Sequence, residues 1–253
     1  MNIVIIGTGY VGLVTGVGLA SLGNNINFLD LDENKIQNLS NKKITFYEPG
    51  LEECFNDDET FSRMFFSSDY ASIEWQNIDI VFVCVQTPNN LETNSVDTNF
   101  LESAIKEINN VNNDDLVITI KSTIPPYEIE KVCEKVGMDS SKLTFNPEFL
   151  REGTAVEDFF KPDRIVLGGT NNEKLNKLKE LYTDFDCEII TTDSISSQLI
   201  KYLANTYLPL RLSFVNEATR LIDYSGGNLD DVLKGVGLDN RIGQHYFRPS
   251  PSW

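Results

Sequence analysis

Apolar and polar residues alternate in blocks along most of the chain, and these blocks predict a regular succession of strands and helices. Short, nearly continuous apolar runs are typical of strands that are covered on both faces of a sheet. The runs predicted as strands are 2–6, 26–30, 78–85, 116–121, 143–145, 164–168 and 188–191.

Between these runs, apolar residues recur three and four positions apart, a spacing that predicts amphipathic helices. The predicted helices are 10–22, 33–39, 100–109, 126–136 and 172–182. Alternation of strands and helices over such a length is typical of a doubly wound parallel sheet with crossover helices. Residues 1–192 are therefore predicted to form one α/β domain.

In the final part of the chain the pattern changes to one long helix. A cap at Asp193 or Ser194 begins this helix, and the glycine pair at 226–227 ends it. Pro209 falls inside the span and is expected to kink it. Because apolar residues cover much of its circumference, the helix needs a further partner. Residues 193–253 are therefore predicted to be part of an all-α region whose partner is either a second domain or a second subunit, in the latter case as a dimerisation region that joins two copies of the chain.

Composition narrows the class of partner. The 253 residues carry 21 Lys and Arg against 38 Asp and Glu, a net charge of −17, and 41% of them are hydrophobic. This acidity disfavours nucleic acid and anionic membrane surfaces, both of which select basic proteins. No apolar stretch is long enough for a membrane span. The four cysteines lie far apart without metal-finger spacing, so we expect no metal site, no disulfide framework and a cytoplasmic location.

A glycine-rich turn is the first candidate for chemistry. Gly7, Gly9 and Gly12 form the pattern G-x-G-x-x-G directly after the first predicted strand and open the first predicted helix. In a dinucleotide-binding turn these glycines allow the tight turn, the approach of a pyrophosphate and close helix–strand packing. Asp30, at the end of the second strand, would accept hydrogen bonds from a ribose and repel a 2′-phosphate, which favours NAD over NADP. The sequence therefore predicts a Rossmann-like NAD-binding domain.

Loops after two later strands carry further candidates. Thr87 and Thr123 would lie beside the nicotinamide, because ligands of open α/β sheets bind at the carboxyl ends of the strands. Ser122 can equally cap the following helix. Glu148 and Glu152 are four residues apart and would lie close together on a turn that runs into a helix. Such a pair can position water or a hydroxyl group, although both can equally be solvated residues of a helix N-terminus.

Basic and amide side chains follow in the long helix and the tail. Lys201 and Asn205 share a helix face, and their ammonium and carboxamide groups would suit a developing oxyanion. A lysine on a solvated face is the plainer interpretation of this pair. Arg241 and Arg248 lie in a tail rich in Gly and Pro, where they would suit a phosphate clamp.

Taken together, these segments resemble the UDP-glucose/GDP-mannose dehydrogenase family. The matching runs, in family order, are GTGYVGL at 7–13, KSTIP at 121–125, NPEFLREG at 146–153, KPDR at 161–164, KYLANTY at 201–207 and RIG at 241–243. They cover essentially the whole chain, and 149–158 with 162–164 is most similar to the UDP-glucose 6-dehydrogenases. Dehydrogenases of GDP-mannose and UDP-N-acetylmannosamine are the nearer alternatives.

The resemblance implies oxidation of the C6 alcohol of UDP-glucose to a carboxylate with two NAD per turnover. The NAD contacts that it implies are Gly7, Gly9, Tyr10, Val11, Gly12, Asp30, Lys35, Thr87, Thr123 and Glu152. The sugar-nucleotide contacts that it implies are Glu148, Phe149, Leu150, Arg151, Lys201, Asn205 and Arg241. The implied catalytic residues are Thr123, Glu148, Glu152, Lys201 and Asn205, with Glu152 as the acid/base or water-positioning group.

The reaction itself makes a further demand. Two hydride transfers take an alcohol to an acid, so the aldehyde must be held covalently or as a hydrate before the second transfer. The resembled family uses a cysteine thiolate in a Gly-Gly-Ser-Cys type run, assisted by an aspartate four residues later. The 253 residues stop at Trp253, where that run is expected to begin, and do not include the family's C-terminal UDP-binding domain. We therefore expect this chain to bind NAD without completing the oxidation.

Two other interpretations stay open. A dehydrogenase of the β-hydroxyacid or 6-phosphogluconate type also joins a Rossmann domain to a long helix and needs no thiol. The run at 146–153 argues against it. The second is a non-catalytic module that retains NAD and dimerises.

Overall fold

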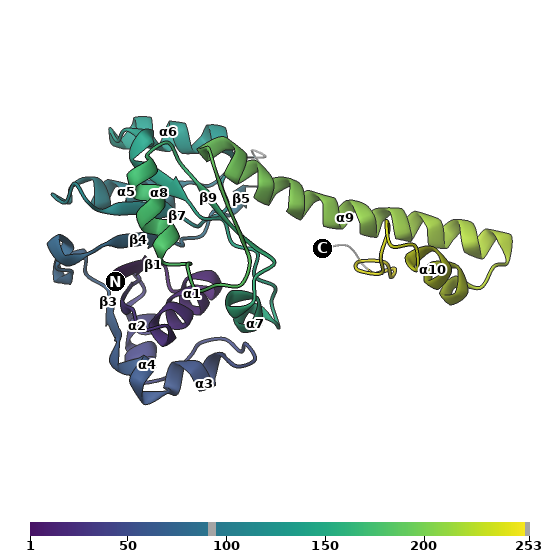
Figure 1. Ribbon diagram of the computed structural model, residues 1–253, viewed down its shortest axis with the longest axis horizontal. Helices are drawn as coiled ribbons and strands as arrows, with labels where there is room; N and C mark the ends of the chain where they lie inside the picture. The colour runs from purple at the N-terminus through teal and green to yellow at the C-terminus, as the bar shows by residue number, and fades with distance from the viewer. Residues whose placement is uncertain (91–94, 251–253) are drawn as a thin grey trace. The chain divides into compact units, whose positions relative to one another are not determined.

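The computed structural model describes residues 1–90 and 95–250 of the chain, which divides into two compact units, Met1–Leu199 and Ile200–Trp253. The first unit is built around an eight-stranded sheet with the strand order β10-β9-β8-β7-β4-β1-β2-β3 (Figure 1). Its strands are β1 (Asn2–Ile6), β2 (Asn25–Leu29), β3 (Met64–Ser67), β4 (Ile80–Val83), β7 (Val117–Ile120), β8 (Leu143–Phe145), β9 (Arg164–Gly168) and β10 (Glu188–Thr192). Every predicted strand is confirmed, with ends that differ by at most two residues.

Several short elements of the first unit were not predicted from the sequence. These are β3, the hairpin β5 (Asn89–Asn90) with β6 (Ser95–Val96), and the helices α3 (Leu51–Asn56), α4 (Asp58–Ser62) and α7 (Ala155–Phe160). The predicted helices are present as α1 (Tyr10–Ser21), α2 (Glu33–Ser40), α5 (Asn99–Asn109), α6 (Pro126–Val136) and α8 (Asn172–Glu180). The missed elements are at most six residues long, too short for a period of 3.6 residues to show.

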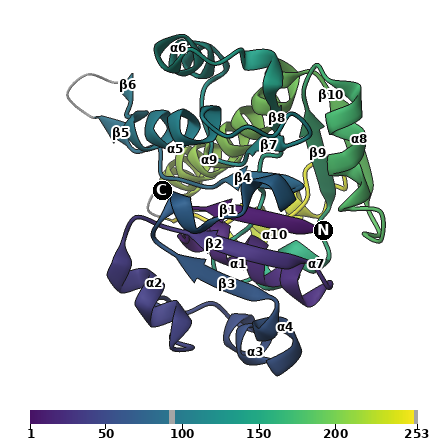
Figure 2. The same ribbon diagram turned by 90° about the vertical axis from the view of Figure 1, so that its left-hand side faces the viewer.

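The middle of the sheet has the expected parallel winding. β1 pairs in parallel with β2 on one side and with β4 on the other, and β4 pairs in parallel with β7. Figure 2 shows β3, β2, β1, β4 and β7 side by side in this order. The chain changes its winding direction at β1, and ligands of doubly wound sheets bind outside the carboxyl ends of the strands at such a point.

The prediction of a wholly parallel sheet is wrong for one pair of neighbouring strands. β8 and β9 pair antiparallel at Phe145 and Gly168. The connection between them contains only the six-residue α7, whose Phe159 packs in the core beside α1. Since no full-length crossover helix returns along the sheet, the chain re-enters beside β8 in the opposite direction.

Alternating residues of β1 bury the two faces of the sheet. Ile3 and Ile5 belong to a core cluster that includes residues of α1, α3, α7 and α8. Val4 and Ile6 belong to a second cluster that includes residues of α5 and α6. This period of two on a strand buried on both faces explains why the strands read as continuous apolar runs in the sequence.

The second unit is helical. α9 (Ser194–Ser225) begins at the end of the first unit, continues through Pro209 and makes up half of the second unit, followed by α10 (Leu229–Gly237). Val215, Ile222, Leu233 and Phe247 form its small core. Arg211 donates to the carbonyl oxygen of Ile242 at 2.8 Å, which holds the tail along α9 (Figure 1).

None of the helices within the described ranges combines the length with the hydropathy that a membrane crossing requires.

Candidate functional site

The turn after β1 has the geometry of a phosphate-binding loop. Gly7 has a φ of +94°, and its N–H donates to the Leu29 carbonyl oxygen at 2.8 Å. A Cβ on Gly12 would lie 1.9 Å from the Gly7 carbonyl oxygen, so a side chain is excluded there. Gly9 precedes α1 without a side-chain cap, and no atom lies within 4 Å of the place where its Cβ would be. The N–H groups at the start of α1 are therefore open to an anion such as a pyrophosphate.

Asp30 follows β2 and lies beside this turn. Its Oδ2 accepts hydrogen bonds from both the N–H and the hydroxyl of Thr8 at 2.8 Å, and from the ammonium of Lys35 at 3.1 Å. Burial raises the pKa of Asp30, but the hydrogen bonds from Thr8, Asp32 and Lys35 outweigh burial and lower the pKa overall. An ionised acid next to an open glycine turn fits the ribose and pyrophosphate of a dinucleotide. Thr8, which helps to hold that acid, was missed because a buried threonine carries no signal in the sequence.

Two loops meet at the carboxyl ends of β4 and β7. The Thr87 hydroxyl donates to the Thr123 carbonyl oxygen at 2.8 Å, so the structure brings the two predicted threonines together. The Ser122 hydroxyl donates to the Val85 carbonyl oxygen at 2.6 Å, and α6 begins without a side-chain cap. The capping interpretation of Ser122 is therefore wrong, because its hydroxyl joins the two loops instead.

Residues 146–154, which we call the carboxylate loop, connect β8 to α7 and carry the predicted acid pair. The loop is not helical before Ala155, so the helical spacing expected to bring Glu148 and Glu152 together does not occur. Glu148 instead accepts a hydrogen bond from the N–H of Leu150 at 2.8 Å. Glu152 is exposed and makes no hydrogen bond or ion pair within the described part of the chain. Its carboxylate is therefore available to a ligand.

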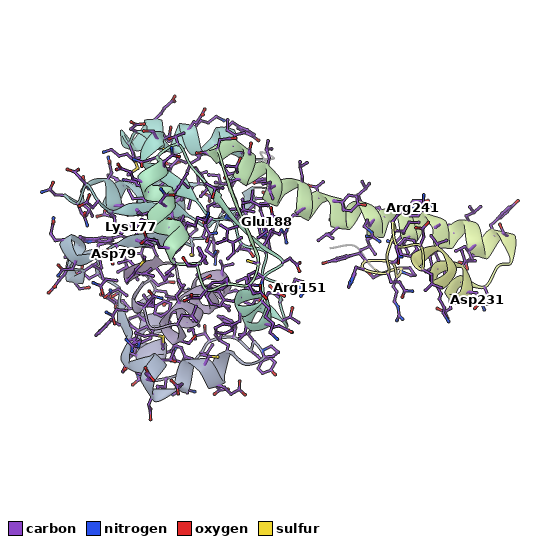
Figure 3. The ribbon with its side chains drawn as sticks, viewed as in Figure 1. Asp79, Arg151, Lys177, Glu188, Asp231 and Arg241 are labelled. Carbon is purple, nitrogen blue, oxygen red and sulfur yellow. The ribbon has the colours of Figure 1, made fainter. Side chains whose placement is uncertain are left out.

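Two arginines stiffen the carboxylate loop and its surroundings. The guanidinium of Arg164 lies 3.6 Å from the ring centroid of Phe149. The side chain of Arg151 donates from Nε to Asp158 Oδ2 at 3.0 Å, and its backbone N–H donates to the same oxygen at 2.9 Å (Figure 3). Arg151 is thus tied to α7, while Leu150 packs against the apolar core.

Glu48 is a site residue that the sequence analysis missed. Its side chain is only 4% exposed. The Oε2 atom accepts hydrogen bonds from the Tyr10 hydroxyl at 3.1 Å and from the Gly153 N–H at 2.9 Å, and Oε1 accepts from the Ala155 N–H at 2.8 Å. Glu48 therefore links the start of α1, where Tyr10 and Val11 were predicted to touch NAD, to the carboxylate loop.

A second buried polar cluster lies at the ends of β7 and β8. The Lys121 ammonium donates to Asn146 Oδ1 at 2.9 Å, and the Tyr182 hydroxyl donates to the same oxygen at 2.7 Å. The Asn146 amide donates to the Val166 carbonyl oxygen at 3.0 Å. This cluster fixes the beginning of the carboxylate loop against two strands. Lys121 and Asn146 entered the sequence analysis only as members of longer runs.

The remaining predicted residues belong to the second unit. Lys201 is buried on α9, and Asn205, one turn later, is exposed. Arg241 pairs with Asp239 at 2.7 Å and is largely exposed (Figure 3). Arg248 lines a hollow together with Leu212 of α9. The roles of Lys201, Asn205 and Arg241 toward a ligand stay predictions.

The cysteines have no activated thiol among them. Burial raises the pKa of Cys84 to about 12 and that of Cys133 to about 11. Burial also raises the pKa values of Cys54 and Cys187. Among the residues that the structure describes, no His, Cys, Asp and Glu side chains form a group that could hold a metal ion.

Comparison with known proteins gives matches over both units. Residues 1–186 match the NAD binding domain of the UDP-glucose/GDP-mannose dehydrogenase family, and residues 195–253 match its central domain. A UDP-glucose 6-dehydrogenase of Rickettsia felis is 39% identical, over 100% of this chain and 57% of that protein. The chain therefore spans less than two thirds of the length of this relative. The dinucleotide that fits the glycine turn is NAD.

Two solved structures show the same architecture. The structure of a UDP-glucose dehydrogenase from Pyrobaculum islandicum matches with a TM-score of 0.90 and 33% identity, over 100% of this chain and 60% of that one. A GDP-mannose dehydrogenase from Pseudomonas aeruginosa matches with a TM-score of 0.86 and 26% identity, over 98% of this chain and 60% of that one. The Rossmann-like fold with its long helix is thereby confirmed.

Proposed function

Since the chain belongs to the UDP-glucose/GDP-mannose dehydrogenase family, we propose that it is the cofactor-binding and central part of a cytoplasmic UDP-glucose 6-dehydrogenase. The observation that carries this choice of sugar nucleotide is the 39% identity to a UDP-glucose 6-dehydrogenase over the entire chain. The likeness to a GDP-mannose dehydrogenase is weaker, at 26% identity, and supplies the alternative substrate.

Residues of the first unit have separate roles in the first oxidation. When bound at the glycine turn, NAD would supply the acceptor for the hydride that leaves the C6 carbon of the sugar. The start of α1 holds the pyrophosphate, and Asp30 with Lys35 orients the adenosine ribose. Thr87 and Thr123 line the nicotinamide end, and Glu152 takes the proton of the C6 hydroxyl, directly or through a water molecule. Phe149 and Leu150 line the place of the sugar.

The second unit supplies the groups that face negative charge. Lys201 and Asn205 stabilise the oxyanion that develops at C6, and Arg241 attracts the substrate's diphosphate. A second copy of the chain pairs with the first along α9. With a net charge of −17, the chain has to attract the anionic substrate through such local cations.

The second oxidation requires a nucleophile that these 253 residues do not offer. A thiol whose pKa lies at about 11 or 12 is almost entirely protonated at neutral pH, and only the thiolate attacks an aldehyde. Burial also raises the pKa values of the Cys54 and Cys187 thiols above their ordinary range. The 253-residue chain, taken by itself, therefore binds NAD without forming UDP-glucuronate.

Two measurements on the purified 253-residue chain test this proposal. Titration with NAD should give saturable binding, and incubation with NAD and UDP-glucose should give no UDP-glucuronate. Formation of UDP-glucuronate would refute the claim that these residues lack the nucleophile.

Saturation-transfer NMR on the NAD-loaded chain tests the sugar. The glucose protons of UDP-glucose should receive more saturation than the mannose protons of GDP-mannose. Transfer to 6-phosphogluconate or to a β-hydroxyacid, with none to UDP-glucose, would instead favour a dehydrogenase that transfers a single hydride. NAD binding and dimerisation without transfer to any of these ligands would favour a non-catalytic module.

A further inference from the structure

We propose that Glu48 is a positioning residue that couples the NAD turn, by which we mean the glycine turn at residues 7–12, to the carboxylate loop. When NAD binds at this turn, Glu48 holds the loop in place and thereby sets the position of the Glu152 carboxylate. The inference deepens the proposed function, on which it rests for the chemistry that Glu152 performs. The physical link itself involves only NAD and residues of the first unit.

Glu48 is a buried carboxyl group that accepts hydrogen bonds from three donors. At 4% exposure, its carboxylate needs hydrogen bonds in place of water. It receives them from the Tyr10 hydroxyl and from the N–H groups of Gly153 and Ala155, and the described residues show no ion pair to it. Removing any one donor leaves buried polar capacity unmet, so the four groups are expected to move as one.

The donors to Glu48 come from two segments that are far apart in the chain, the start of α1 and the carboxylate loop with the start of α7. Tyr10 is the first residue of α1 and directly follows Gly9, whose surroundings are open for a pyrophosphate. Gly153 directly follows Glu152 and has a φ of +91°, a backbone conformation that few residues other than glycine adopt. A continuous path of covalent and hydrogen bonds therefore runs from the NAD turn through Glu48 to the backbone of Glu152.

The residues on both sides of Glu152 are also held by Asp158. The N–H of Arg151 donates to Asp158 Oδ2 at 2.9 Å, and the Thr154 hydroxyl donates to the same oxygen at 3.1 Å. Glu152 thus has anchored neighbours, and its own side chain makes no hydrogen bond or ion pair to the residues that the structure describes. Its direction is set by its backbone, and Glu48 holds one end of that backbone.

Electrostatics at Tyr10 agree with this geometry. Burial raises the pKa of Tyr10 most strongly, and the hydrogen bond to Glu48 and the charges of Glu48, Glu152 and Asp158 raise it further. The phenol therefore stays protonated and donates to Glu48 throughout the neutral range. The carboxylate of Glu152 acts on the same phenol, so both acids lie within electrostatic reach of the start of α1.

If Glu48 served only as a cap for α7, it would need fewer hydrogen-bond donors than it has. A cap needs only the N–H groups at the beginning of α7, and these bonds would persist without Tyr10. The bond from Tyr10 matters only if Glu48 also connects α1 to the loop. Removal of the Tyr10 hydroxyl therefore separates the two roles.

Hydrogen exchange with and without NAD tests the proposal in the full 253-residue chain. In the wild type, saturating NAD should slow exchange of the amides at 151–156 by about fivefold or more, because the loop is coupled to the turn. In Tyr10→Phe, the same amides should exchange without NAD at about the wild-type rate, because the bonds from Gly153 and Ala155 to Glu48 remain, and their exchange should slow by less than about twofold on addition of NAD. The variant Glu52→Gln changes an exposed acid of α3 and should behave as the wild type.

Protection of the amides at 9–13 by NAD serves as the internal check that NAD is bound. Loss of coupling at 151–156 with retained protection at 9–13 supports the role of Glu48. An NAD response at 151–156 in Tyr10→Phe equal to that of the wild type overturns it. Glu48→Gln should raise exchange at 151–156 even without NAD, and unchanged exchange there also overturns the proposal. Because no sugar is present, these outcomes are independent of which sugar nucleotide the enzyme takes.

Discussion

At the scale of single residues, the site depends on side chains that hold one another before any ligand arrives. The carboxylate of Asp30 already accepts bonds from Thr8 and Lys35, and that of Glu48 accepts bonds from Tyr10 and the carboxylate loop. A sequence can point to Asp30, because its place after the second strand is a known feature of dinucleotide sites. It could not point to Glu48, whose partners lie 38 to 107 residues away along the chain.

Replacement of Asp30 by alanine is the clearest test at this scale. Asp30→Ala should weaken NAD binding by about 1–3 kcal/mol, because it removes charge-assisted hydrogen bonds to the ribose. Calorimetric titration with NAD measures the change. Asp58→Ala, which alters an exposed acid on α4, is the matched control and should leave the affinity unchanged. An unaltered affinity in Asp30→Ala would contradict the assignment.

The difference in NAD affinity between the wild type and Asp30→Ala should depend on pH in a defined way. The pKa of Asp30 is lowered in the folded protein, so the carboxylate stays ionised at pH 5 and is protonated only as the pH falls below its ordinary value of 3.8. The affinity difference between wild type and Asp30→Ala should therefore persist from pH 7 to pH 5. A difference that disappears between pH 7 and pH 5 would assign the effect to another group.

At the scale of elements, the sequence predicted the helices and strands that are long enough to show a recognisable apolar pattern. The long helices repeat their apolar pattern often enough to be recognised, as the buried Leu101, Ala104, Ile105 and Ile108 of α5 show, and the strands covered on both faces stand out as continuous apolar runs, as β1 shows. α7 has six residues, and β8 and β9 meet through a single pair, Phe145 and Gly168. The antiparallel direction of that pair depends on how α7 packs beside α1, which is a tertiary property and leaves no mark on either strand.

Two glycine variants separate the folding of the β1–α1 turn from its binding. Gly9→Ala should fold normally, because no atom lies within 4 Å of the new Cβ, yet it should weaken NAD binding by about tenfold or more, since the methyl group occupies the approach of the pyrophosphate.

Gly12→Ala should instead lower the free energy of unfolding by about 2–4 kcal/mol, because its Cβ would lie 1.9 Å from the Gly7 carbonyl oxygen. Thermal unfolding and NAD titration of both variants check this contrast. If Gly9→Ala unfolds as easily as Gly12→Ala, or binds NAD as tightly as the wild type, the division of roles is wrong.

At the scale of the whole molecule, α9 carries a stripe of large exposed side chains. The stripe consists of Leu203, Tyr207, Leu210, Phe214, Leu221 and Tyr224, each more than half exposed. Their spacing of three, four and seven residues places them along one side of the helix. An apolar stripe of this length is typical of a surface that another chain covers, and a second subunit is one of the two partners expected from the sequence.

A charge in the middle of the stripe should break that dimer. Leu210→Glu is expected to raise the dimer dissociation constant by about 100-fold or more, because it buries an unpaired carboxylate in an apolar interface. Sedimentation velocity over a concentration series measures the shift. Asp223→Lys changes the charge on the opposite side of α9 and is expected to leave the association unchanged. A wild-type chain that remains monomeric at high concentration would refute the assignment of the stripe.

The strand order has a consequence for how the protein is made. Among the strands that the structure describes, β1 pairs with β2 and β4, and the backbone bonds that frame the glycine turn at 7–12 run from Gly7 to Leu29 and from Cys84 to Ile6. Every one of these backbone partners has therefore been synthesised when about a third of the chain has been translated. At about 5–20 residues per second, several further seconds pass before α9 is complete. NAD that meets the nascent chain in this interval would stabilise the turn while the helix that carries the apolar stripe is still being synthesised.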